Sequence, residues 1–191
     1  MNVYYSVMRT IDEDKRARIQ QAVFSLTATE GLTGLAMSKV AKTAGVSPAT
    51  IYIYYNDKED MLSRIYEQVK TLFDAGLHAA IDAAPDLDAK IRAAEWHYIT
   101  QFRQYPEQAR FVDAVLANEQ AIDAKAKAFA DDQAQPLTDL FAQVQAAPAY
   151  RPVDALLGTT LFSVPLQMLK SQATDAQLNA AIDTIIAALK R

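Results

Sequence analysis

Two short helical segments separated by a sharp break near the N-terminus constrain the fold of this chain more than any other feature. The first segment covers residues 37–44, where apolar side chains recur at helical spacing. Gly45 ends it, and Ser47 can accept a hydrogen bond from an unpaired backbone N–H group at the start of the next helix. Pro48 suits the first position of that helix, which covers about residues 48–54. Two short helices joined by a tight turn predict a helix-turn-helix, whose second helix usually enters the major groove of DNA.

Longer helices flank this pair. The preceding helix should cover about residues 12–30 and end at Gly31, with a core face formed by Ile19, Ala22, Val23 and Leu26. The following helix should cover about residues 58–80, with Asp57 as its cap. The role of residues 1–12 stays open between an arm that touches DNA and a loose terminus.

The composition excludes several classes of protein. The 191 residues include only 5 glycines and many alanines and leucines, which favours an all-α fold. The absence of cysteine excludes disulfides and thiolate metal sites, and two histidines leave little room for a histidine metal site. No apolar run approaches the ~18 residues of a membrane span. The N-terminus lacks the basic flank and apolar stretch of a signal peptide, so we expect a cytoplasmic protein without cofactor or metal.

Charge is distributed unevenly along the chain. Residues 1–58 carry seven Lys and Arg against five Asp and Glu, a formal charge of +2, whereas the whole chain carries −4. A basic first third in an acidic protein indicates that this part meets an anion, although chance would also produce the difference. The motif therefore has to decide.

The stretch of residues 40–62 reads VAKTAGVSPATIYIYYNDKEDML. It resembles the DNA-binding signature of the tetracycline-repressor (TetR) family, roughly I-A-x-x-A-G-V-S-x-x-T-[LI]-Y-x-[YH]-[FY]-x-[NSD]-K-E-x-L. The resemblance covers about residues 10–62, and further along the chain only length and helical character agree. It implies a helix-turn-helix DNA-binding domain over residues 1–58 and a helical ligand-binding and dimerisation domain over residues 59–191.

The resemblance also implies which side chains contact DNA. Three positions that commonly hold phosphates carry Tyr52, Tyr54 and Lys58, and the exposed, base-facing positions carry Pro48, Ala49, Thr50 and Ile53. None of the base-facing residues can make a bidentate bond to guanine, so apolar contact with thymine methyl groups fits better. Ser47 joins this set, while Ile51 and Tyr55 seat the helix. Two alternatives stay open, since Tyr52 could be packed and Ile53 buried.

One position departs from the family pattern. The helix at residues 37–44 usually starts with a Thr or Ser that caps it and binds phosphate, but this chain has Ala36, which cannot cap. Ser38 remains in the first turn as a candidate phosphate ligand. Lys39 and Lys42 could add charge there or simply be solvated.

The second half should consist of further helices. We expect them at about residues 87–104, 107–118, 121–144 (bent near Pro136), 153–170 and 174–190, with a loop at residues 146–152. Thr174 and Gln177 form a capping box before the last helix. Large apolar residues fall on more than one face of the helix at residues 87–104, so other helices should surround it.

The last two helices carry apolar stripes that predict a dimer interface. The interface residues are Leu157, Leu161, Val164, Leu178, Ile182, Ile185 and Leu189. Two such helices from each chain could form a four-helix bundle across a two-fold axis, as the resemblance also implies. The alternative is an ordinary core within one chain. Pro165 interrupts or kinks its helix.

A ligand pocket is expected between the helices of the second domain. Its candidate lining residues are Phe73, Trp96, His97, Ile99, Phe102, Phe111, Val115, Phe129, Phe141 and Met168. Glu95 and His97 would be informative if buried, because a buried polar group needs a partner. The aromatic set favours a mainly apolar or aromatic ligand.

Three hypotheses follow. The leading one is a homodimeric regulator, most simply a repressor, that binds a palindromic operator and is released by a small ligand. The second is a helical enzyme or metal protein, for which Asp74 and His78, four residues apart, and Glu95 near His97 are the candidates. The third is a DNA-binding dimer without a small-molecule effector.

Overall fold

The computed structural model describes the backbone of residues 3–191 and the side chains of residues 13–191. Every regular element in this part of the chain is helical, which confirms the all-α class. The helices are α1 (Val3–Glu30), α2 (Met37–Ala44), α3 (Pro48–Tyr54), α4 (Lys58–Asp74), α5 (Leu77–Asp82), α6 (Leu87–Gln104), α7 (Pro106–Leu116), the short 3-10 helix η1 (Glu119–Ala121), α8 (Ala124–Gln133), α9 (Gln135–Ala146), α10 (Ala155–Lys170) and α11 (Asp175–Leu189).

The chain forms two compact units. The first unit holds the chain up to Lys70 together with Tyr105–Ala130, and the second unit holds Thr71–Gln104 together with Asp131–Arg191. Helix α4 therefore begins in the first unit and ends in the second. The predicted domain boundary between residues 58 and 59 stays a prediction.

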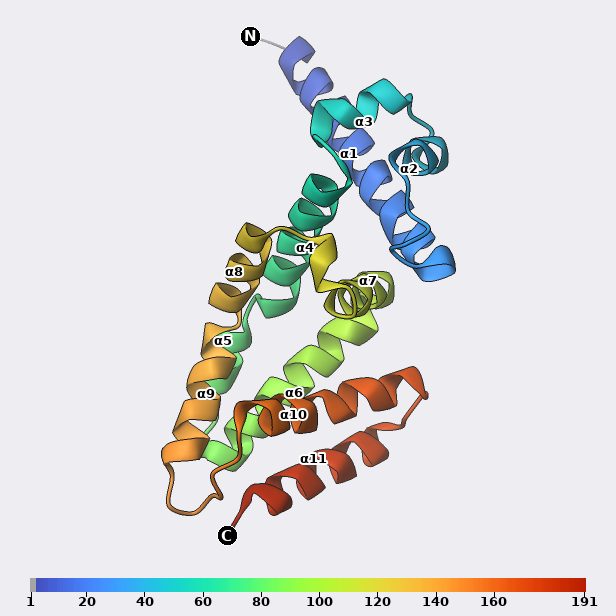
Figure 1. Ribbon diagram of the computed structural model, residues 1–191. Helices are drawn as coiled ribbons and strands as arrows, with labels where there is room; N and C mark the ends of the chain where they lie inside the picture. The colour runs from blue at the N-terminus through green and yellow to red at the C-terminus, as the bar shows by residue number, and fades with distance from the viewer. Residues whose placement is uncertain (1–2) are drawn as a thin grey trace. The chain divides into compact units, whose positions relative to one another are not determined.

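In the first unit α2 and α7 pack against α1, and α3 packs against α2. Figure 1 shows α2 and α3 as two short helices joined by a turn, with α2 alongside α1. Phe24 of α1 meets Phe111 of α7 edge to face, with 5.5 Å between the ring centroids. The Arg18 guanidinium of α1 donates a hydrogen bond to the carbonyl of Ala44, the last residue of α2, at 3.1 Å. Helix α1 thus contacts both α2 and α7.

Helix α1 begins earlier than the sequence predicts. Its first residue is Val3 instead of a residue near Asp12. No glycine or proline stands before Asp12, so nothing in the sequence stops the helix from continuing toward the N-terminus. The side chains of residues 1–12 lie outside the described part. The predicted alternatives for this segment, a DNA-contacting arm or a loose terminus, therefore stay open.

Two other predicted helices are divided. Helix α4 ends at Asp74, because Gly76 takes a left-handed conformation with φ 86° and starts α5. The predicted helix over residues 121–144 is present as η1, α8 and α9, and it breaks at Ala134, next to the N-terminal turn that holds Pro136. Pro165, in contrast, lies buried inside α10 without ending it.

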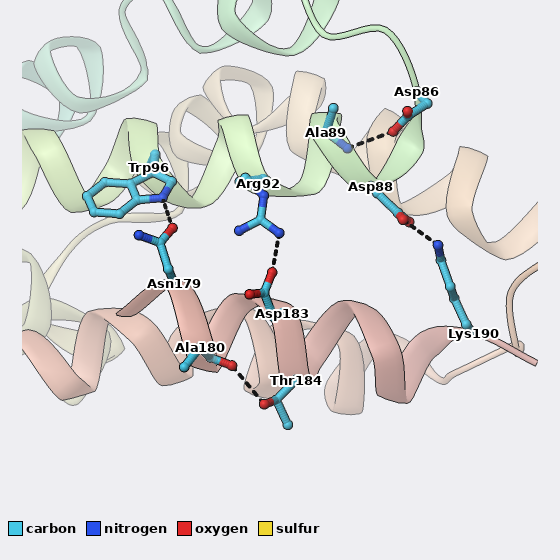
Figure 2. Close-up of polar contacts among 10 residues, drawn as sticks. All are labelled: Asp86, Asp88, Ala89, Arg92, Trp96, Asn179, Ala180, Asp183, Thr184 and Lys190. Atoms are coloured by element: carbon cyan, nitrogen blue, oxygen red, sulfur yellow. Dashed lines mark hydrogen bonds and ion pairs between the residues drawn. The ribbon is translucent and has the colours of Figure 1, made fainter. Parts of the chain in front are cut away.

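Helix α6 is the centre of the second unit. It packs against α5, α9, α10 and α11, which confirms that other helices surround it. Figure 2 shows polar contacts that join it to α11, where the indole N–H of Trp96 donates to Asn179 at 3.0 Å and Arg92 pairs with Asp183. Buried apolar side chains fill the space between these helices.

The cap residues explain where several helices begin. The Ser47 hydroxyl accepts a hydrogen bond from the Thr50 amide at 3.1 Å, and Thr174 forms the predicted capping box with Gln177. Ala36 stands at the same position before α2 and makes no side-chain cap. The N-terminal amides of α2 therefore lack the stabilisation that α3 and α11 have.

These differences predict opposite effects of two substitutions. Ala36→Ser should raise the free energy of unfolding by about 1 kcal/mol, because the new hydroxyl caps α2, whereas Ser47→Ala should lower it by about 1 kcal/mol. Urea denaturation followed by circular dichroism measures both. No gain from Ala36→Ser would mean that backbone geometry, and not the missing hydroxyl, limits this helix end.

Candidate nucleic-acid interface and ligand cavity

Helix α3, the candidate DNA-reading helix, is held by contacts on its inner face and at its C-terminal end. Ile51 and Tyr55 are buried beneath it. The Arg64 guanidinium of α4 donates to the carbonyl of Tyr54 at 2.6 Å and lies 5.3 Å from the centre of the Tyr55 ring. Burial raises the pKa of the Tyr55 hydroxyl. These contacts fix the orientation of a helix of only seven residues.

The opposite face of α3 carries two large exposed side chains. Tyr52 is 57% exposed and Ile53 is 78% exposed, so neither the packed alternative for Tyr52 nor the buried one for Ile53 holds. Pro48 and Ala49 are exposed beside them. The hydroxyl oxygens of Thr50 and Ser47 lie 2.8 Å apart. An exposed apolar side chain flanked by hydroxyl groups fits a surface that binds a partner.

The remaining predicted DNA contacts differ in how free they are. Ser38 is exposed in the first turn of α2. The Lys58 ammonium donates to the carbonyl of Leu32 at 2.7 Å, so it braces the turn between α1 and α2. Tyr54, the last residue of α3, is half-buried. Lys39 forms an ion pair with Glu30. Tyr52 is thus a better candidate than Lys58 for a phosphate contact.

The second unit contains a cavity of about 270 Å³. Helices α6, α9, α10 and α11 form its wall, and most of the side chains are apolar, among them Ile91, Phe141, Phe162, Ile185 and Leu189. The rings of Phe141 and Phe162 meet edge to face with centroids 5.7 Å apart. A volume of this size lies near the lower end of ~300–1,000 Å³ for small-molecule sites.

Only Phe141 of the predicted pocket residues lines this cavity. Ile91 and Glu95, one helical turn apart, form the cavity face of α6, so the aromatic residues on its other faces point elsewhere. Those that lie in the second unit without lining the cavity are Phe73, Trp96, His97, Ile99, Phe102 and Met168. Phe111, Val115 and Phe129 belong to the first unit.

Glu95 is the polar residue that distinguishes the cavity. Its side chain is 0% exposed, and neither carboxyl oxygen has a hydrogen-bond partner. Burial raises the pKa of this carboxyl from 4.5 to about 9. His97, two residues on, serves a different contact, because its Nε2–H group donates to the carbonyl of Phe73 at 2.7 Å. Sequence reasoning singled out both residues, and only Glu95 lines the cavity.

The residues considered for a metal site do not meet. Asp74 ends α4 and accepts a hydrogen bond from the Tyr98 hydroxyl at 2.6 Å, whereas His78 belongs to α5 and pairs with Asp82 at 3.1 Å. They do not share one helix face, because the chain breaks at Gly76 between them. Across the described residues, no group of three His, Asp or Glu side chains is placed to hold a metal ion. None of the helices there has the length and apolar character of a membrane span.

The predicted dimer interface is corrected for α11. Leu178, Ile182, Ile185 and Leu189 are buried in the core of their own chain, because this stripe packs toward α6. On α10 the predicted residues divide. Leu157 is 45% and Val164 37% exposed, whereas Leu161 is half-buried and lines the cavity.

Part of the first unit matches known proteins in sequence. Residues 19–65 match the family described as bacterial regulatory proteins, tetR family. An uncharacterized HTH-type transcriptional regulator of Haemophilus influenzae is 34% identical over 97 residues, which are 51% of each chain. The match thus spans about half the length of this curated relative.

Solved structures share the fold over nearly the whole chain. A TetR family transcription regulator from Marinobacter aquaeolei has a TM-score of 0.82 at 24% identity, over 96% of this chain and 100% of that one. The TetR-like regulator LfrR of Mycobacterium smegmatis, in complex with proflavine, has a TM-score of 0.63 at 16% identity, over 93% and 98%.

The buried carboxyl predicts a pH-dependent stability. The folded protein keeps the Glu95 proton up to about pH 9, whereas the unfolded chain releases it near its ordinary pKa of 4.5. The free energy of unfolding should therefore fall between these pH values, by at most about 1.4 kcal/mol per pH unit. Glu95→Gln removes this contribution, so its stability relative to the wild type should rise with pH. Urea titrations at several pH values measure the difference, and a constant difference would contradict the prediction.

Proposed function

We propose that this chain, which belongs to the TetR family of bacterial transcriptional regulators, is a homodimeric repressor that binds a palindromic operator and is released by a small ligand. The observation that carries the DNA-binding part is the exposed face of α3. Tyr52 and Ile53 stand on the outer side of a helix that Ile51, Tyr55 and Arg64 fix from the other side. Such a regulator would act in the cytoplasm, where bacterial DNA lies, and not as an enzyme.

The roles on α3 follow from side-chain chemistry. Ile53, Pro48 and Ala49 suit apolar contacts with thymine methyl groups in the major groove. The Tyr52 hydroxyl suits a phosphate oxygen, which fixes register without reading sequence. The other proposed contacts are the exposed Ser38 and Ser47 and the partly buried Thr50, Tyr54 and Lys58.

The proposed dimer interface uses the outer faces of α10 and α11, which pack side by side (Figure 1). On α10 this face carries Leu156, which is 78% exposed, with Leu157 and Val164. On α11 it carries exposed small residues at helical spacing, Ala176, Ala180, Thr184 and Ala187, which allow a partner helix to approach closely. A two-fold axis through such an interface requires a palindromic operator.

Ligand response would reach the reading head through α4. This helix begins in the first unit, and its last residues are held by α6 in the second. The Phe73 carbonyl bonds to His97, Asp74 bonds to Tyr98, and the rings of Phe73 and Phe102 lie 5.1 Å apart. A ligand that prefers a shifted α6 would therefore shift the end of α4 and weaken DNA binding.

The cavity favours this effector-controlled regulator over one without an effector. A cavity of about 270 Å³ with a buried, unpartnered carboxyl gives a small molecule a place to bind. The solved complex of LfrR with proflavine concerns a protein of the same fold and supports a mainly apolar or aromatic ligand. The alternative, control by a partner protein or by abundance, gives the cavity no role.

The first test selects bound duplexes from a random DNA pool at moderate salt. An enriched palindrome supports the proposal. Tyr52→Phe should weaken binding to all enriched sequences by about fivefold per half-site, because each subunit loses one phosphate hydrogen bond. Ile53→Ala should instead relax the preference at one base pair of each half-site.

The control for this selection is Leu116→Ala, which shortens another exposed apolar side chain, on α7 and outside the helix-turn-helix. It should leave both affinity and preference unchanged. Failure to enrich any sequence at low salt, with a dimer verified by sedimentation, would overturn the DNA-binding proposal.

A charge on the outer face of α10 should separate the proposed dimer. Leu156→Glu places a carboxylate where the partner would pack, so the dimer dissociation constant should rise at least about tenfold. Leu116→Glu, at a leucine that is 56% exposed in the first unit, is the matched control and should leave the dimer intact. Analytical ultracentrifugation measures both, and equal effects of the two variants would sink the α10 interface.

A further inference from the structure

One polar group in the wall of the cavity in the second unit lacks a hydrogen-bond partner. Both oxygens of Glu95 lack a hydrogen-bond partner inside a fully buried side chain. Around it the wall consists of apolar side chains from four helices, with the rings of Phe141 and Phe162 among them. A buried carboxyl without a partner destabilises the fold, so a molecule that supplies that partner gains affinity from it.

The other polar side chains of the wall already have partners. Gln145 exchanges two hydrogen bonds with the backbone of Val153, and Asp154 accepts from the Leu157 amide at 2.9 Å. The Thr159 hydroxyl donates to the carbonyl of Ala155, one turn earlier, at 3.0 Å. Among the residues that line the cavity, Glu95 therefore stands apart as the fully buried polar side chain that has no hydrogen-bond partner.

The wall also lacks any basic side chain. No Lys, Arg or His is among its residues. A carboxylate or phosphate on a ligand would enter the apolar space without a counter-charge, and the cost of removing it from water would not be offset. A group that donates hydrogen bonds and accepts the carboxyl proton is favoured instead, because the ion pair that forms carries no net charge into the apolar space.

We propose that the effector class of this cavity is a flat, mainly apolar amine of one or two fused rings, whose nitrogen bonds to the Glu95 carboxyl. The ring lies against Phe141 and Phe162, and the nitrogen supplies the N–H donors that both carboxyl oxygens lack. When the free base enters, the carboxyl O–H bond breaks and a third N–H bond forms on a primary amine, so that an ammonium faces a carboxylate. This inference rests on the proposed function only where it assigns the bound amine an effect on DNA binding, since the binding of the amine itself needs no DNA.

The test uses three probes that share one ring: 1-naphthylmethylamine, 1-naphthylmethanol and 1-naphthoate. Isothermal titration calorimetry with the full chain, without DNA, gives their dissociation constants. The wild type should bind the amine about tenfold to hundredfold more tightly than the alcohol, because a hydrogen bond to a charged group is the stronger one. The naphthoate should bind most weakly.

Two variants assign the preference to Glu95. Glu95→Gln keeps the shape of the side chain and Glu95→Leu removes its polarity, and both should bind amine and alcohol with equal affinity. The matched control is Asp154→Asn, which removes a carboxylate from the same wall but keeps a residue that caps α10. It should retain the preference for the amine. Thermal unfolding verifies that each variant is folded.

Each outcome decides the inference. It is overturned if the wild type does not bind the amine at millimolar concentration, if the alcohol or naphthoate binds as tightly, or if the preference survives in both Glu95 variants. Amine binding through Glu95 that leaves the affinity for a selected operator unchanged would support the ligand class and contradict the effector role. Loss of operator binding in the absence of any probe concerns the proposed function alone.

Discussion

The second unit depends on the burial of one helix from several sides at once. Helix α6 contacts α5, α9, α10 and α11, so that one of its faces is fully buried, while its charged side chains, such as Arg92 and Arg103, lie on the faces that reach solvent. Ile91, Ala94, Tyr98 and Ile99 suit this position because their burial stabilises the unit. Glu95 does not suit this position, because a carboxyl on this buried face of the helix cannot reach water. An enclosing arrangement that stabilises the fold therefore also creates the chemical character of the cavity.

The first unit is built on a different principle, since its reading helix is too short to be stable alone. A helix of seven residues forms in isolation only marginally, so its neighbours must define it. Ser47 caps its start, Arg64 bonds to its last carbonyl, and Ile51 and Tyr55 anchor one side. All of these contacts are on the ends and inner face. The outer face, which carries Tyr52 and Ile53, is consequently left exposed for the proposed contact with DNA.

Local signals in the sequence predicted this part of the structure well. Gly45, Ser47 and Pro48 mark helix ends through their own backbone and side-chain chemistry, and the structure uses them that way. The exposure of Tyr52 and Ile53 was implied by the resemblance to the TetR signature and not by these local signals. The bounds of α6 were also predicted correctly, because Pro85 and Pro106 mark breaks on either side of it.

What the sequence could not supply was which surfaces meet. The stripe of Leu178, Ile182, Ile185 and Leu189 marks a buried face of α11, but periodicity does not reveal whether the cover is α6 or a second chain. Phe111 is as aromatic as Phe141, yet it packs in the first unit, because Tyr105–Ala130 joins residues distant in sequence. The break before α5 did have a signal, since Gly76 sits between two otherwise helical stretches.

Helix α10 belongs to two surfaces at once. Leu161 and Phe162 face the cavity, while Leu156 and Val164 face outward. The wall between a bound molecule and a partner subunit would then be a single helix, about 10 Å across. Pro165 leaves that helix without one of its internal hydrogen bonds at the same level, so this is where it bends most readily. In such a geometry the two cavities of a dimer would be separated by two α10 helices, one from each subunit, and filling one cavity would affect the shape of the other.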